Sequence, residues 1–150
     1  MRVGVFTPLL SKLPLPEVLR KLAGYGIQTV ELGTGNYPGD AHCPLSLLSS
    51  RPALREFREL LKGHGVSTSA LSCHGNPLHP DRARARHDQE VSRKTILLTE
   101  KLGVPVVVDF SGCPGDSPKS RQPNWVTAHG HRSTCRFWRG SGKKSRNPIG

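Results

Sequence analysis

The sequence of 150 residues is poor in several features that would mark a particular class of protein. Aromatic residues make up 5% and hydrophobic residues 35% of the chain, which is lean for a large core. The four cysteines form no C-x-x-C pair, so neither a zinc ribbon nor a thioredoxin-like motif is indicated. No apolar run approaches the ~18 residues of a membrane span, and Pro8 interrupts the only apolar stretch near the start. We therefore expect a cytoplasmic protein with reduced thiols and no membrane partner.

Acidic residues are also missing from one region, because none follows Asp116. Residues 1–116 carry 14 Lys and Arg against 11 Asp and Glu, whereas residues 117–150 carry eight bases and no acid. The net charge of +11 would by itself suggest a polyanion partner. Since most of the excess charge lies in the last 34 residues, the nearly balanced body predicts no nucleic-acid partner of its own.

What the chain does contain is a regular alternation of strand and helix patterns. Strands are predicted over residues 2–6, 29–32, 66–72 and 104–110, and amphipathic helices over 15–22, 52–62 and 84–102. The last of these strands is nearly all apolar, as expected for a strand covered on both faces. This alternation predicts an α/β fold with a parallel sheet, either open and doubly wound or half of an eight-stranded barrel.

The turn after the first predicted strand decides between these two architectures. Residues 7–10 contain no G-x-G-x-x-G motif, which argues against a dinucleotide-binding Rossmann fold. We therefore predict a (β/α)8 TIM-barrel type fold, truncated to about four βα units and followed by an irregular C-terminal tail. A complete barrel needs about 250 residues.

Candidate site residues lie where the predicted strands end, because ligands of βα folds bind at the carboxyl ends of the strands. Glu31 could bind a substrate hydroxyl or support a base, or else hydrogen-bond a neighbour in the barrel floor. His74 could reach a sugar oxygen, a phosphate or a metal, or else bond loop carbonyls. Asn76 could orient a hydroxyl, although Asn before Pro77 is also an ordinary turn residue. We predict Glu31, His74 and Asn76 as substrate-binding residues and assign no catalytic residue.

Several His and Cys residues on the same loops raise the question of a metal site. Their spacing matches no compact zinc pattern, so no metal ligand is predicted among them. His42 and His79 are expected to be structural or solvent-facing. The residues concerned are His42, Cys43, Cys73, His74 and Cys113.

The strand-end loops carry motifs that support a family resemblance. The motifs are GVFT at residues 4–7, VELGTGNYPGD at 30–40, LSCHGNPLHP at 71–80 and FSGCPG at 110–115. With them, residues 1–126 resemble the N-terminal half of the sugar phosphate isomerase/epimerase family, which has a xylose-isomerase-like barrel. The resemblance implies a sugar or sugar phosphate as substrate.

The resemblance also implies a divalent metal, Mn²⁺, Mg²⁺, Co²⁺ or Zn²⁺, which polarises the carbonyl and hydroxyl of a ketose while carboxylates move a proton. In the family, the metal carboxylates and the metal histidine come from strands of the second half of the barrel. We therefore expect that this chain alone binds no metal and is an inactive fragment of an isomerase or epimerase.

The tail, residues 127–150, has no acid and no sustained apolar period. Its Arg, Gly, Ser and His content is typical of a GC-rich coding sequence that is translated out of frame, which predicts a frameshifted or truncated family member. The alternative is a disordered basic tail that has its own purpose. Two other functions therefore stay open: a half-barrel that self-associates through its sheet edges, and a nonspecific nucleic-acid binder that acts through the tail.

Overall fold

The computed structural model describes residues 3–113, and these residues belong to two compact units. One unit contains Met1–His74 and Lys94–Asp109, and the other contains Gly75–Arg93 and Phe110–Gly150. We call them the sheet unit and the loop unit. The predicted basic tail, residues 127–150, lies outside the described residues. The same holds for its Lys and Arg side chains, which are proposed to contact nucleic acid.

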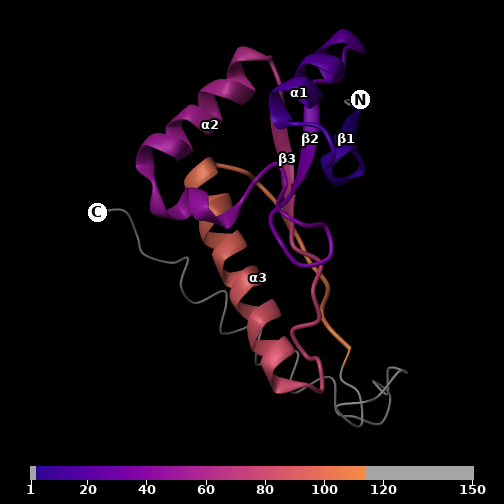
Figure 1. Cartoon of the computed structure of the whole chain (residues 1–150), viewed down its shortest axis with the longest axis vertical. Helices are drawn as coiled ribbons and strands as arrows, with labels where there is room; N and C mark the ends of the chain where they lie inside the picture. The colour runs from indigo at the N-terminus through magenta and orange to yellow at the C-terminus, as the bar shows by residue number, and fades with distance from the viewer. Residues whose placement is uncertain (1–2, 114–150) are drawn as a thin grey trace. The chain divides into compact units, whose positions relative to one another are not determined.

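Helices and strands alternate along the chain as the sequence predicts (Figure 1). Two short 3₁₀ helices, η1 (Thr7–Leu10) and η2 (Leu45–Ser49), lie in the connections. The other elements are β1 (Gly4–Phe6), α1 (Leu15–Gly24), β2 (Thr29–Gly33), α2 (Arg51–Gly63), β3 (Ser67–Ser72), α3 (Arg82–Leu102) and β4 (Val107–Val108).

The four strands form one parallel sheet in the order β1-β2-β3-β4, all within the sheet unit. Val5 pairs with Val30, Phe6 with Glu31, and Leu32 with Leu71. Because all pairs are parallel, the carboxyl ends of the strands lie at the same end of the sheet. The prediction of a parallel α/β sheet is confirmed.

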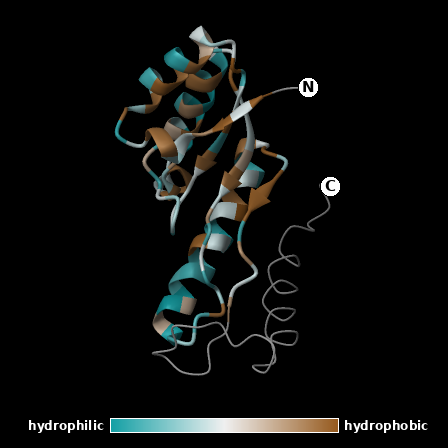
Figure 2. Cartoon of the chain, turned by 90° about the vertical axis from the view of Figure 1, so that its right-hand side faces the viewer, coloured by the Kyte–Doolittle hydropathy of each residue, from teal (hydrophilic) through white to brown (hydrophobic). Residues whose placement is uncertain are grey.

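The helices differ in how they distribute polar residues. The first half of α3 is mainly hydrophilic, whereas the strands of the sheet combine apolar residues with small or polar ones (Figure 2). The helical spacing predicts four inward positions in α3, of which Val91, Thr95 and Leu98 are buried and Leu102 is partly buried against the core. The helical period therefore identified the buried face of α3 correctly.

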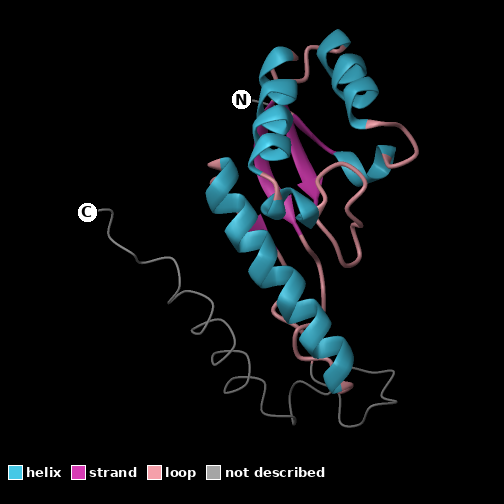
Figure 3. Cartoon of the chain, turned by 60° about the vertical axis from the view of Figure 1, so that its left-hand side comes forward, coloured by secondary structure: helices cyan, strands magenta, loops and turns pink. Residues whose placement is uncertain are grey.

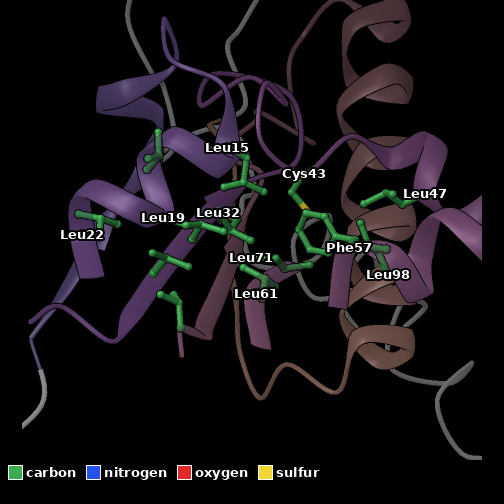
Figure 4. Close-up of a cluster of buried hydrophobic side chains, with 13 residues drawn as sticks. Leu15, Leu19, Leu22, Leu32, Cys43, Leu47, Phe57, Leu61, Leu71 and Leu98 are labelled. Atoms are coloured by element: carbon green, nitrogen blue, oxygen red, sulfur yellow. The ribbon is translucent and has the colours of Figure 1, made fainter. Parts of the chain in front are cut away.

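Figure 3 shows the helices on one side of the sheet, and the hydrophobic core of the described residues lies between them and the sheet. Val30, Leu32 and Leu71 point from the strands into this core and are completely buried. Val18 and Leu19 of α1, Phe57 and Leu61 of α2, and Leu98 of α3 pack in the same cluster. Figure 4 shows several of these side chains together, with the sulfur of Cys43 beside the Phe57 ring. All three helices thus cover the same face of the sheet.

The fourth strand is shorter than predicted, since only Val107–Val108 pairs with β3 in place of residues 104–110. The Val104 N–H donates to the Thr99 carbonyl at the end of α3, where Gly103 has a φ of 71°. Pro105 has no N–H to donate to the sheet. These residues therefore close the helix before the strand can begin. Val106 is 48% exposed, so the expectation of a strand covered on both faces is wrong for the described part of the chain.

The helix-to-strand turns follow a common pattern, which α2 illustrates. The Ser50 side chain accepts a hydrogen bond from the Ala53 N–H and begins the helix. At the other end, the Gly65 N–H donates to the Lys62 carbonyl, and Gly65 has a φ of 65°, which favours glycine.

None of the helices within residues 3–113 is long and apolar enough to cross a membrane.

Candidate functional site

The open face of the sheet, which is the face turned away from the helical core, bears Phe6, Glu31 and Ser72. Strand side chains alternate between the two faces, so Glu31 points away from the core that contains Val30 and Leu32. The Ser72 hydroxyl donates a hydrogen bond to the Glu31 carboxylate. Ser72 is completely buried and lies at the end of β3. The predicted residue Glu31 is therefore held in one orientation at the carboxyl end of the sheet.

His74 follows β3 by two residues and approaches the last residue of β1. The centroids of the Phe6 and His74 rings are 6.1 Å apart, with 39° between the ring planes. Because Phe6 also pairs with Glu31, Phe6 is a neighbour of both predicted residues of the sheet unit. Glu31 and His74 therefore lie at the same carboxyl-terminal end of the parallel sheet, as the sequence predicts.

The loop after β2 folds back over the strand ends. Asn36, which has a φ of 54°, donates from its side-chain amide to the Cys73 carbonyl at 2.9 Å. The Tyr37 N–H donates to the His74 carbonyl at 3.1 Å. A Cβ at Gly33 would lie 2.6 Å from the Gly39 carbonyl oxygen, so only glycine permits this close return of the loop. These bonds fix the backbone that carries His74.

A pair of buried hydroxyls supports the same loop from beneath. The Thr34 and Thr95 hydroxyl oxygens are 2.7 Å apart, and the Thr34 hydroxyl also donates to the Ser72 carbonyl. Both threonines are completely buried. The pair therefore links the loop after β2 to α3 at the level of the strand ends, and every partner lies in the sheet unit.

Asn76, the third predicted residue, belongs to the loop unit. Its side-chain amide donates to the Cys113 carbonyl at 3.0 Å, and its side-chain oxygen accepts from the Cys113 N–H at 2.8 Å. The backbone N–H of Asn76 donates to the Asp88 carboxylate at 2.7 Å. Both polar ends of the Asn76 side chain are thus engaged by backbone, and its direct contact with a substrate stays a prediction.

The two histidines expected to be structural or solvent-facing make hydrogen bonds to backbone groups. The Nε2 atom of His42 lies 2.9 Å from the Leu13 carbonyl oxygen, and His42 is only 4% exposed. The Nδ1 atom of His79 accepts from the Asp81 N–H at 2.9 Å. Both imidazoles therefore bond loop backbone, which agrees with a structural role for these two residues.

The described residues do not assemble a complete metal site. Within residues 3–113, no group of three or more His, Cys, Asp and Glu side chains is placed to hold an ion. The resident metal that the resemblance implies thus finds no ligand set in this part of the chain, and no chemical step is derived through it.

Sequence reasoning missed Phe6, Ser72 and Asn36 as members of the site. The first two could have been found, because the strand period of two places both on the same face as Glu31. Asn36 contributes through a left-handed backbone conformation and a bond to Cys73. Nothing in the local pattern of the loop 33–43 specifies that pairing.

A separate cavity of about 450 Å³ lies at the other end of the sheet. Its walls come from the last turns of α2 and α3 and the beginning of β3, and they include Arg58, Lys62, Thr68 and Leu102. None of the predicted site residues lines it. Size alone therefore does not locate the candidate site, which rests on the chemistry of the strand ends.

Comparisons with known proteins bear on the whole chain. No family model matches the sequence. An uncharacterized protein of Bacillus subtilis strain 168, YfiH, is 35% identical over 128 residues, which are 85% of this chain and 41% of that protein. The chain thus spans less than half the length of this curated relative.

Solved structures give the fold. A xylose isomerase candidate from Rhodospirillum rubrum ATCC 11170 has a TM-score of 0.64 at 12% identity, over 96% of this chain and 48% of that one. The chain has the fold of half a TIM barrel. A D-psicose 3-epimerase from Clostridium cellulolyticum H10, solved with D-tagatose, has a TM-score of 0.56 at 16% identity, over 95% and 50%. A D-psicose 3-epimerase solved with D-fructose has a TM-score of 0.56 at 13% identity.

Proposed function

We propose that the chain forms the N-terminal half of a sugar isomerase or epimerase of the sugar phosphate isomerase/epimerase family. The observation that carries the proposal is the Ser72-oriented Glu31 carboxylate at the carboxyl end of a half-barrel sheet. The similarity to barrels whose structures include D-psicose 3-epimerases supports a sugar as the ligand. The proposed substrate is a small ketose or its phosphate.

In this proposal each residue of the open face has a binding task. The Glu31 carboxylate accepts hydrogen bonds from sugar hydroxyls, and the Ser72 hydroxyl keeps that carboxylate in place. The His74 imidazole offers a polar ring atom, while the adjacent Phe6 ring provides an apolar surface for the C–H face of a sugar. Proton transfer beside the carbonyl is not assigned to these residues. A divalent metal would belong to the complete barrel.

The test is the binding of D-fructose and fructose 6-phosphate to the 150-residue chain, measured by ligand-observed NMR. Glu31→Gln keeps the shape of the side chain but weakens a charged acceptor, so we expect about tenfold or greater loss of affinity. Glu59→Gln is the matched control, because it removes the same charge from the exposed surface of α2. Equal binding by the wild type and Glu31→Gln would contradict the assignment of Glu31.

A second proposal is self-association through the sheet edges. Within the described residues, β1 pairs only with β2, and β4 only with β3. Val3 beside β1 is 63% exposed and Val106 beside β4 is 48% exposed. Exposed parallel edges with apolar side chains invite pairing with a second copy of the chain. Sedimentation equilibrium should therefore show dimers or larger species, which Val106→Lys should weaken; a wild-type monomer at all concentrations would refute this proposal.

A further inference from the structure

We infer that Asn76 is a positioning residue that latches the loop after β3 to the loop after β4. This inference deepens the proposed function, because loops at strand ends form the rim of a ligand site in βα folds. All groups in the latch belong to the loop unit. The hydrogen-exchange test of the latch therefore concerns the loop unit alone.

The central contact of the latch is a two-point pairing between a side chain and a peptide group. The Asn76 carboxamide donates to the Cys113 carbonyl at 3.0 Å and accepts from the Cys113 N–H at 2.8 Å. This pairing reproduces the donor and acceptor of a backbone partner in a sheet. Asn presents both functions on one short side chain, whereas Asp lacks the donor and Ala lacks both.

The side of the latch that carries Asn76 is itself fixed. The Asn76 oxygen also accepts from the Leu78 N–H at 3.3 Å, which closes a tight turn. From α3, the Asp88 carboxylate accepts from the Asn76 N–H at 2.7 Å, and the Gln89 side chain donates to the Pro77 carbonyl at 2.7 Å. The carboxamide of Asn76 is thus presented to Cys113 from a loop that the helix holds.

The opposite side of the latch depends on the absence of a side chain. Gly112 has a φ of 95°, a conformation that side chains other than glycine rarely adopt. A Cβ at this position would lie 3.0 Å from the Leu78 backbone nitrogen and 3.1 Å from the Asn76 side-chain oxygen. Gly112 therefore allows the loop after β4 to approach closely enough for the pairing. Gly112 and Asn76 therefore act together in the latch.

Along the chain, Asn76 lies two residues after His74, and Cys113 lies five residues after the end of β4. Releasing the pairing would free the loop after β4 without removing any apolar side chain from the core. We therefore expect a loss of local order and of ligand affinity with little change in global stability. This combination distinguishes a positioning residue from a core residue.

Hydrogen exchange measured by mass spectrometry on the full 150-residue chain tests the latch directly. In Asn76→Ala, the peptides containing Leu78 and Cys113 should exchange about tenfold faster or more, since each loses a hydrogen bond. Asn76→Asp should rescue part of the protection, because it keeps the acceptor for both amides. Gly112→Ala should reproduce the effect of Asn76→Ala. Gly63→Ala is the matched control, because its Cβ would meet nothing within 4 Å.

The affinity for D-fructose, measured in parallel, separates the latch from the proposed function. A positioning role predicts that Asn76→Ala weakens binding about tenfold at an unchanged midpoint of thermal unfolding, with partial recovery in Asn76→Asp. Unchanged exchange in Asn76→Ala would overturn the latch. Faster exchange with unchanged fructose affinity would overturn its role in positioning. A wild-type chain that binds no sugar would refute the proposed function, while the exchange data would still decide whether the latch exists.

Discussion

Different kinds of interaction stabilise the interior of the sheet unit and the interior of the loop unit. The hydrophobic core cluster of the described residues lies in the sheet unit, where strand and helix side chains such as Leu19, Leu32 and Leu71 are completely buried. In the described part of the loop unit, the buried apolar side chains are few and small, with Ala85 and Val91 among them. Side-chain hydrogen bonds to backbone take over the role of the core there.

This difference teaches how the chain obtains stability in one unit and loop geometry in the other. Burial of apolar surface is non-directional and contributes most of the folding free energy. Hydrogen bonds contribute little net free energy but specify geometry, and they cost energy if one partner is removed. The sheet unit should therefore determine whether the chain folds, and the hydrogen bonds of the loop unit should determine the shape of the loops that contain Asn76 and Cys113. Substitutions in the two units should have effects of different size and range.

The largest effect is expected from Leu71→Ala in the centre of the sheet. Leu71 is completely buried and pairs with Leu32 and Val107 on neighbouring strands. Its truncation should cost about 2–5 kcal/mol of unfolding free energy, because it leaves a cavity that the surrounding side chains fill only in part. Urea unfolding followed by circular dichroism measures the loss.

The neighbouring residue provides the control for this experiment. Ser72 lies on the opposite face of the same strand, where its hydroxyl bonds Glu31. Ser72→Ala should reduce stability far less than Leu71→Ala but should weaken sugar binding. If the two variants lost equal stability, the proposed division between the core face and the open face would be wrong.

The elements that the sequence predicted correctly are those governed by burial. The apolar spacing of Leu15, Val18, Leu19 and Leu22 identified the buried face of α1, because a helix must turn its apolar side toward the sheet. The same reasoning placed Glu31 and His74 at the carboxyl ends of parallel strands. Periodicity reports which side of an element is covered, and this is a local property of the sequence.

The features that the sequence did not predict depend on single hydrogen bonds and backbone details, local in one case and long-range in the other. The shortened β4 results from the bond between the Val104 N–H and Thr99 and from the missing donor of Pro105, which a run of valines hides. The pairing of Asn76 with Cys113 joins residues 37 positions apart. The motif around Asn76 pointed to this residue, but its partner could only be recognised once the two loops were placed side by side.

A smaller effect is expected from the thiol of Cys43 in alkaline solution. Burial, with a further contribution from the Asp40 charge, raises the pKa of Cys43 from 9.0 to about 12. Because the folded pKa lies above the unfolded one, the folded chain keeps its full stability below pH 9 and loses stability as the pH rises toward 12. At pH 10 the loss should be about 1 kcal/mol.

The measurement is urea unfolding at pH 8 and pH 10 in the wild type and in Cys43→Ala. The alanine variant has no thiol to titrate, so the other groups that ionise in this range cancel in the comparison. A wild type that shows the same loss between the two pH values as the variant would contradict a buried thiol. Such a result would also weaken the distinction between the two units, since Cys43 packs in the core of the sheet unit.

The smallest effect is expected at Asp81, which begins α3 in the loop unit. The N–H groups of Arg84 and Ala83 lower the pKa of the Asp81 carboxyl by donating to it. Its contribution is therefore present above an unfolded pKa of about 3.8 and is lost as the pH falls through the lower folded value. Asp81→Ala should speed hydrogen exchange in the first turn of α3 and leave the global unfolding midpoint near that of the wild type. Asp81→Asn keeps an acceptor oxygen, so this variant should preserve most of the protection against exchange. If Asp81→Ala instead lowered global stability as much as Leu71→Ala, the loop unit would share in the cooperative core, and the contrast between a unit held by burial and a unit held by directed hydrogen bonds would fail.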